Sequence, residues 1–73
     1  MDEERGRFTI NNRVAGLVES HPTKAPAQAR ASSLARLTGI VHSVFDRRAR
    51  WGMENEWFYN ESGEVFKTGK RRD

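Results

Sequence analysis

The segment from Ala27 to Gly52, AQARASSLARLTGIVHSVFDRRARWG, constrains the fold of this chain more than any other part of its sequence. Its apolar residues recur with the spacing of one helix face. That stripe consists of Ala27, Ala31, Leu34, Leu37, Val41, Val44 and Phe45, and the opposite face carries Arg36, Ser43, Arg47 and Arg50. The spacing therefore predicts one long helix with an apolar side and an arginine side.

The ends of this helix are predicted from residues that start or stop helices. Pro26 suits a first helical position, because the residue before it, Ala25, is biased towards extended backbone. Gly39 weakens the middle by about 1 kcal/mol relative to alanine. Gly52 is expected to be the C-cap. The helix is thus predicted to run from Pro26 to Gly52.

The segments on either side of this helix favour strands. Phe8 and Ile10 alternate with polar neighbours, as in a short strand. Residues 11–21 fit a short helix capped by Asn11 or Asn12, which we favour, or a hairpin that turns at these two asparagines. Residues 57–59 and 65–67, separated by a turn at residues 62–63, predict a β-hairpin.

A chain of 73 residues is too short for more than one domain. We therefore expect a single small α+β domain over residues 1–73, with residues 1–6 and 70–73 flexible. One long central α-helix would pack on a C-terminal β-hairpin, joined by an N-terminal strand.

A winged helix-turn-helix is the alternative fold. Ala35, Gly39, Ile40 and Phe45 have the spacing of that motif, with the later hairpin as the wing. This alternative predicts a DNA-binding repressor or an excisionase-like protein. The continuous helix is preferred, because Arg48 occupies a position that the motif requires to be apolar.

Charge and composition restrict the class of function. The chain has no cysteine and a net charge of +3, and residues 26–52 alone carry +4. The absence of cysteine excludes disulfides and thiolate metal sites. The acidic opening does not read as a signal peptide, and no apolar run reaches the ~20 residues of a membrane span. A basic surface of this kind predicts an acidic protein or a nucleic acid as partner.

The candidate partner-binding residues are cations and the aromatic residues near them. They are Arg36, Arg47, Arg48, Arg50, Trp51, Tyr59, Lys67, Lys70, Arg71 and Arg72. The spacing of His21 and His42 is not that of a metal site, so we expect both on the surface. Glu54, Glu56, Glu61 and Glu64 are expected to form a solvated hairpin rim. No catalytic motif appears, so we predict no enzyme activity, no metal and no cofactor.

The chain as a whole, from MDEERGRFTINNRVAGLVESH through the arginine-rich segment to GEVFKTGKRRD, resembles a small RNA-polymerase-binding transcription regulator of a Xanthomonas lytic phage. The resemblance implies binding to the large subunits of bacterial RNA polymerase, with inhibition of promoter-dependent initiation by σ displacement, and antitermination. It places the protein in the host cytoplasm. We further expect a monomer with no membrane or small-molecule ligand, in weak contact with nascent RNA or DNA.

Overall fold

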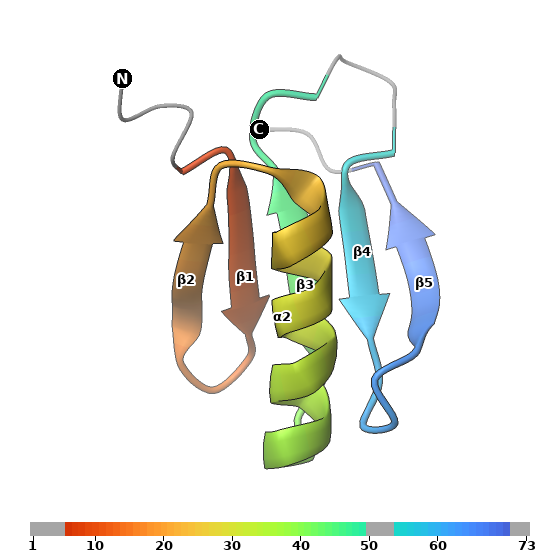
Figure 1. Ribbon diagram of the computed structural model, residues 1–73. Helices are drawn as coiled ribbons and strands as arrows, with labels where there is room; N and C mark the ends of the chain where they lie inside the picture. The colour runs from red at the N-terminus through yellow and green to blue at the C-terminus, as the bar shows by residue number, and fades with distance from the viewer. Residues whose placement is uncertain (1–5, 50–53, 71–73) are drawn as a thin grey trace.

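The computed structural model describes residues 6–49 and 54–70, which form a five-stranded antiparallel sheet with one helix across it (Figure 1). The elements are β1 (Phe8–Asn12), β2 (Gly16–His21), α2 (Lys24–Thr38), β3 (His42–Asp46), β4 (Glu56–Tyr59) and β5 (Val65–Gly69). The strand order is β2-β1-β3-β4-β5, so β3 is central. The predicted α+β class is confirmed, with hairpins on both sides of β3 rather than only at the C-terminal side.

The helix ends much earlier than the sequence pattern predicts. Gly39 adopts the left-handed conformation (φ 72°) and its backbone N–H donates to the carbonyl of Ala35 at 2.9 Å, which closes the helix. The residues that follow, rich in β-branched and aromatic side chains, form β3. The predicted helix to Gly52 is therefore wrong after Thr38, and Gly52 itself lies outside the described residues. The helix-turn-helix is excluded as well, because residues 42–46 form a strand where its second helix would lie.

The helix also begins earlier than predicted, at Lys24 after the extended residue Thr23. Pro26 is its third residue. The first-turn N–H groups of a helix have no intrahelical acceptor, so a proline there loses no hydrogen bond. Ala25 is helical although the proline after it favours extended backbone at that position.

Residues 11–21 form a hairpin, so the short helix that we favoured for them is wrong. β1 pairs with β2, and the chain turns immediately after Asn12. The side-chain oxygen of Asn12 accepts hydrogen bonds from the backbone N–H groups of Val14 and Ala15 at 2.9 and 2.6 Å. Gly16 then takes a positive φ of 75°. The asparagine that suggested a helix cap instead caps a turn.

The predicted hairpin near the C-terminus is confirmed as β4 and β5. Its turn lies against the helix, because the hydroxyl of Ser32 donates to the carbonyl of Gly63 at 2.6 Å. Gly63 has a φ of 80°, and a Cβ there would lie 2.7 Å from the Ser32 hydroxyl oxygen. Only glycine therefore fits this contact.

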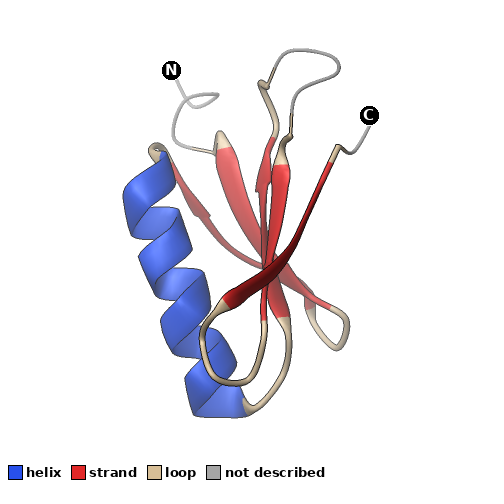
Figure 2. Cartoon of the chain, turned by 90° about the vertical axis from the view of Figure 1, so that its right-hand side faces the viewer, coloured by secondary structure: helices blue, strands red, loops and turns tan. Residues whose placement is uncertain are grey.

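The core lies between α2 and one face of the sheet, as Figure 2 shows. Three alanines on the helix, Ala27, Ala31 and Ala35, are fully buried. Their small side chains let the helix approach the core residues of the sheet, Phe8, Ile10, Val44 and Tyr59. The predicted apolar stripe is thus correct for its first half, whereas Leu37 is 76% exposed.

His42 is buried, although we predicted it on the surface. It is 1% exposed and its two ring nitrogens are 2.8 Å from the Ile40 carbonyl and 3.1 Å from the Asn12 side-chain nitrogen. A neutral ring with its proton on Nδ1 satisfies both contacts, since it donates to Ile40 and accepts from Asn12. His42 therefore ties the central strand to the first hairpin.

Replacing the buried Ala31 with leucine is expected to lower the free energy of unfolding by about 1–3 kcal/mol, because the larger side chain forces the helix from the sheet. Ala29→Leu is the matched control, since Ala29 is exposed on the same helix and should change stability by no more than about 0.5 kcal/mol. Urea unfolding measures both, and equal stability of the two variants would contradict this packing.

Candidate functional site: the basic end of the sheet

β1 begins and β3 and β5 end at the same end of the sheet (Figure 1). Cationic residues stand next to these strand ends in the sequence. We call this surface the basic end and define it by Arg7, Lys24, Arg47, Arg48 and Lys70. Lys24 joins the set because α2 begins at this end. Residues from four separate parts of the sequence are therefore brought together by the fold.

Backbone hydrogen bonds hold these segments in place. The N–H of Arg47 donates to the carbonyl of Arg7 at 2.8 Å, which extends the pairing of β1 with β3. The N–H of Asp46 donates to the carbonyl of Asn55 at 2.8 Å, and the N–H of Asn55 donates to Gly69 at 2.9 Å. The ends of β3 and β5 are thus linked through the residue that precedes β4.

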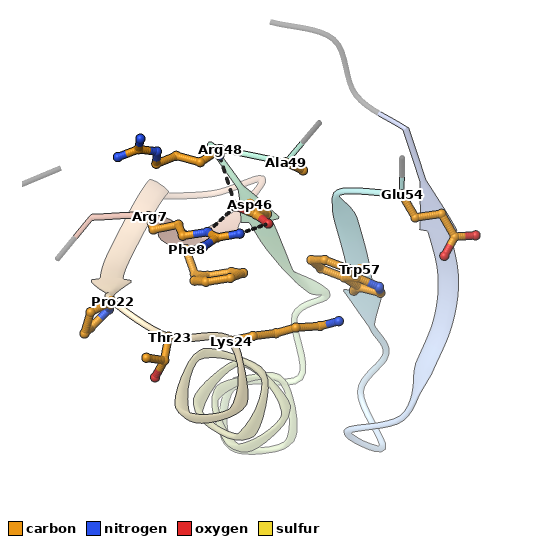
Figure 3. A pocket seen from close by; sticks show the side chains of 10 residues that line it. All are labelled: Arg7, Phe8, Pro22, Thr23, Lys24, Asp46, Arg48, Ala49, Glu54 and Trp57. Atoms are coloured by element: carbon orange, nitrogen blue, oxygen red, sulfur yellow. Dashed lines mark hydrogen bonds and ion pairs between the residues drawn. The ribbon is translucent and has the colours of Figure 1, made fainter. Parts of the chain in front are cut away.

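A cavity of about 670 Å³ opens at the basic end. Figure 3 shows its lining residues, which include Arg7, Lys24 and Arg48 together with Asp46 and Trp57. The Lys24 ammonium lies 4.4 Å from the centroid of the Trp57 ring, a cation–π contact. Trp57 is half-buried against the core, so it forms a wall of the cavity and a platform for Lys24.

Asp46 is the buried acidic group of the basic end and is 7% exposed. Its carboxylate accepts hydrogen bonds from the Arg7 guanidinium at 3.0 and 3.2 Å and from the backbone N–H of Arg48 at 3.0 Å. Burial alone would raise the pKa of Asp46. The hydrogen bonds from Arg7 and Arg48, with the positive charges of Arg7 and Lys24, outweigh that effect and hold the pKa below its usual value. Asp46 therefore serves to fix Arg7 and the chain around Arg48.

Three of the predicted partner-binding residues, Arg47, Arg48 and Lys70, lie together at the basic end, and all three are exposed. Arg47 also donates to the carbonyl of Gly6 at 3.0 Å. Four others, Arg50, Trp51, Arg71 and Arg72, lie outside the described residues.

The remaining predicted residues lie apart from the basic end. Arg36 is exposed in the last turn of α2, at the opposite end of the helix. Lys67 lies on the face of the sheet away from α2, with its ammonium 5.5 Å from the centroid of the Phe58 ring. Tyr59 is 8% exposed in the core, so its prediction as a partner-binding residue is corrected. Burial raises the pKa of the Tyr59 hydroxyl, and a hydrogen bond with Gln28 lowers it by a smaller amount, so the pKa stays above its usual value.

Two residues of the basic end, Arg7 and Lys24, were missed by the sequence reasoning. Neither belongs to the arginine-rich segment, residues 26–52. Arg7 precedes β1 and Lys24 is the first residue of α2. Only the antiparallel pairing of β1 with β3 and the start of α2 bring them near Arg48. The sequence signal that could have found them is the strand pattern of residues 42–46, which fixes this pairing.

The side chains of the basic end are mainly cationic, although Asp46 and Glu54 also line its cavity. Both carboxylate oxygens of Asp46 are engaged by Arg7, which makes this group a poor proton acceptor. In residues 6–49 and 54–70 no three acidic or histidine side chains come together as a metal site would need. In the same part of the chain no helix is long and apolar enough to cross a membrane.

Comparison with known proteins adds no relative. No protein family, no curated protein and no solved structure matches the chain.

The low pKa of Asp46 makes stability depend on pH. A carboxylate whose pKa is lowered by folding stabilises the protein above its ordinary pKa of about 3.9, and this contribution is lost as the pH falls through the lowered value. We expect Asp46→Asn to be less stable than wild type by about 1–3 kcal/mol near pH 7 and to lose less stability on acidification. Urea unfolding from pH 7 down to below the ordinary aspartate pKa measures the stability at pH 7 and its loss on acidification. Glu61→Gln, at an exposed position, is the control. Identical acid dependence of wild type and Asp46→Asn would contradict the assignment.

Proposed function

We infer that this protein is a non-enzymatic transcription regulator that binds bacterial RNA polymerase. The resemblance of its sequence to a phage regulator of that kind is the first support. The structural observation that supports it is the basic end, where Arg47, Arg48, Lys70 and Lys24 are exposed and Arg7 is half-buried beside Asp46. A surface of this kind suits a partner whose own surface is acidic.

The charges of the basic end would act mainly on encounter and orientation. Positive side chains on one end of a small domain steer it towards a negative surface and reject partners of like charge. Arginines add planar guanidinium groups that can pair with two carboxylate oxygens at once. The large subunits of the polymerase are the partner that the resemblance implies.

Binding would regulate transcription because the protein would occupy a surface of the polymerase that other factors use. The resemblance implies that the protein displaces σ, inhibits promoter-dependent initiation and promotes antitermination. It would act in the host cytoplasm, as a monomer and without a cofactor. A domain of 73 residues can do this without any reaction, because it needs only to cover a surface that σ or another factor uses.

Duplex DNA is the partner that the alternative prediction favoured, and that alternative rested on a helix-turn-helix. In the described chain the residues after Gly39 form β3, so the motif that favoured DNA is lost. Binding to duplex DNA is therefore retained only as an outcome of the experiment.

The first test is co-migration of the purified protein with bacterial RNA polymerase core on a sizing column at moderate salt. A random DNA duplex is run separately. We expect the protein to elute with the core and not with the duplex. Elution with the duplex alone would overturn the proposal.

The second test assigns binding to the basic end. The double variant Arg47→Glu/Arg48→Glu is expected to weaken binding to the core by more than about tenfold, because it places negative charge against an acidic surface. The control is Arg36→Glu, which reverses one charge at the far end of α2, against two in the double variant, and should bind within about twofold of wild type. Titration of labelled protein with core gives the affinities, and circular dichroism checks the fold. Equal weakening by both variants would contradict a role specific to the basic end.

A further inference from the structure

α2 leaves one face of the sheet uncovered (Figure 2), and that face carries a second hollow. Side chains alternate along each strand, so Ser43 and Phe58, which pair across β3 and β4, point away from the helix. They help to line a groove of about 350 Å³. We call it the sheet groove, and its lining includes Asn11, Arg13, Val41, Ser43, Phe58 and Phe66.

Phe66 gives the sheet groove an exposed aromatic ring. The register of β4 and β5 shifts between Phe58, which pairs with Lys67, and Tyr59, which pairs with Val65, so Phe66 is the extra residue of a β-bulge. A bulge redirects a side chain, and the Phe66 ring lies 6.4 Å from the Phe58 ring, tilted at 55°. Phe66 is nevertheless 54% exposed. The Phe58 pairing therefore leaves much of the Phe66 ring open to a planar ligand.

Two polar groups in the sheet groove have unused hydrogen-bonding capacity. Ser43 is 7% exposed, and its hydroxyl has no hydrogen bond within the described part of the chain. The Asn11 amide nitrogen donates to the Thr9 hydroxyl at 3.2 Å, whereas its carbonyl oxygen has no partner among residues 6–49 and 54–70. A purely apolar occupant would cover these groups without satisfying them, at a cost in free energy.

The charge around the sheet groove is positive. Arg13 lies at its edge, exposed, and forms no ion pair with any described residue. The Lys67 ammonium is held above the Phe58 ring at 5.5 Å from its centroid. None of the described residues that line the groove is acidic. The groove is thus complementary to an anionic ligand.

These features together fit a nucleotide better than a protein side chain. A base offers a flat apolar face for Phe66 and edge groups for Ser43 and Asn11, and its phosphates suit Arg13 and Lys67. The ribose 2′-hydroxyl, which can both donate and accept, adds a partner that DNA lacks. We propose that the sheet groove binds single-stranded RNA, with one base stacked on Phe66. This site is separate from the basic end and does not depend on polymerase binding.

The test is fluorescence anisotropy of a labelled oligouridylate of about eight nucleotides with the full chain, in the absence of polymerase. Phe66→Leu keeps an apolar side chain but removes the aromatic face, and we expect it to weaken binding about tenfold. Phe66→Trp, which restores an aromatic face, should bind like wild type. Circular dichroism and urea unfolding verify that each variant is folded.

The charge and the sugar are tested in the same assay. Arg13→Ala should lower the affinity and reduce the slope of log K against log salt by about one, whereas Arg36→Ala, on the helix side, should change neither. The deoxy oligonucleotide of the same length should bind more weakly than RNA.

Three results would overturn the proposal. They are no binding of RNA by the wild type, equal binding of RNA and DNA, and RNA binding by Phe66→Leu that equals that of wild type. Phe66→Leu is also titrated with polymerase core, as for the basic-end variants. If it binds RNA like wild type but binds the core more weakly, the groove is a protein-docking surface. The three results of the RNA assay do not bear on whether the basic end binds polymerase.

Discussion

In the described chain one helix packs against a five-stranded sheet, and this constraint governs the rest of the structure. α2 rests on β1 and β3 through three buried alanines, which bring helix and sheet close together in a chain too small for a second layer. In the described chain the other face of the sheet receives no helix. Because α2 covers only one face of the sheet, the strand side chains of the other face form a broad surface to which a ligand can bind.

The fold could be predicted from sequence as far as its class, its C-terminal hairpin and the strand around Phe8. The error in the middle had a physical cause. Val41, Val44 and Phe45 fall by coincidence on the helical stripe begun by Ala27, and the glycine before them, Gly39, is also compatible with a weakened helix. Gly39 in the left-handed conformation ends the helix instead, and the β-branched and aromatic residues that follow fill a central strand. Short apolar segments of this length fit both periods.

The candidate site was predictable in kind but not in position. Excess arginine predicted a cationic surface, and Arg47, Arg48 and Lys70 are exposed at the same end of the sheet. Strand pairing decided which other cations join them, since Arg7 is carried there by the register of β1 against β3. The sheet groove could not be anticipated at all, because the position of Phe66 depends on a one-residue bulge, which no periodic pattern shows.

The two outer strands share one more property with a consequence for the protein in a crowded cell. β2 and β5 form the edges of the sheet, and each contains a register shift against its neighbour, at Val18 and at Phe66. An undistorted edge offers a regular row of amide and carbonyl groups along which further copies can add and grow into fibrils. A bulge interrupts that row and increases the local twist. Both irregularities therefore guard a small, half-covered sheet against self-propagating aggregation.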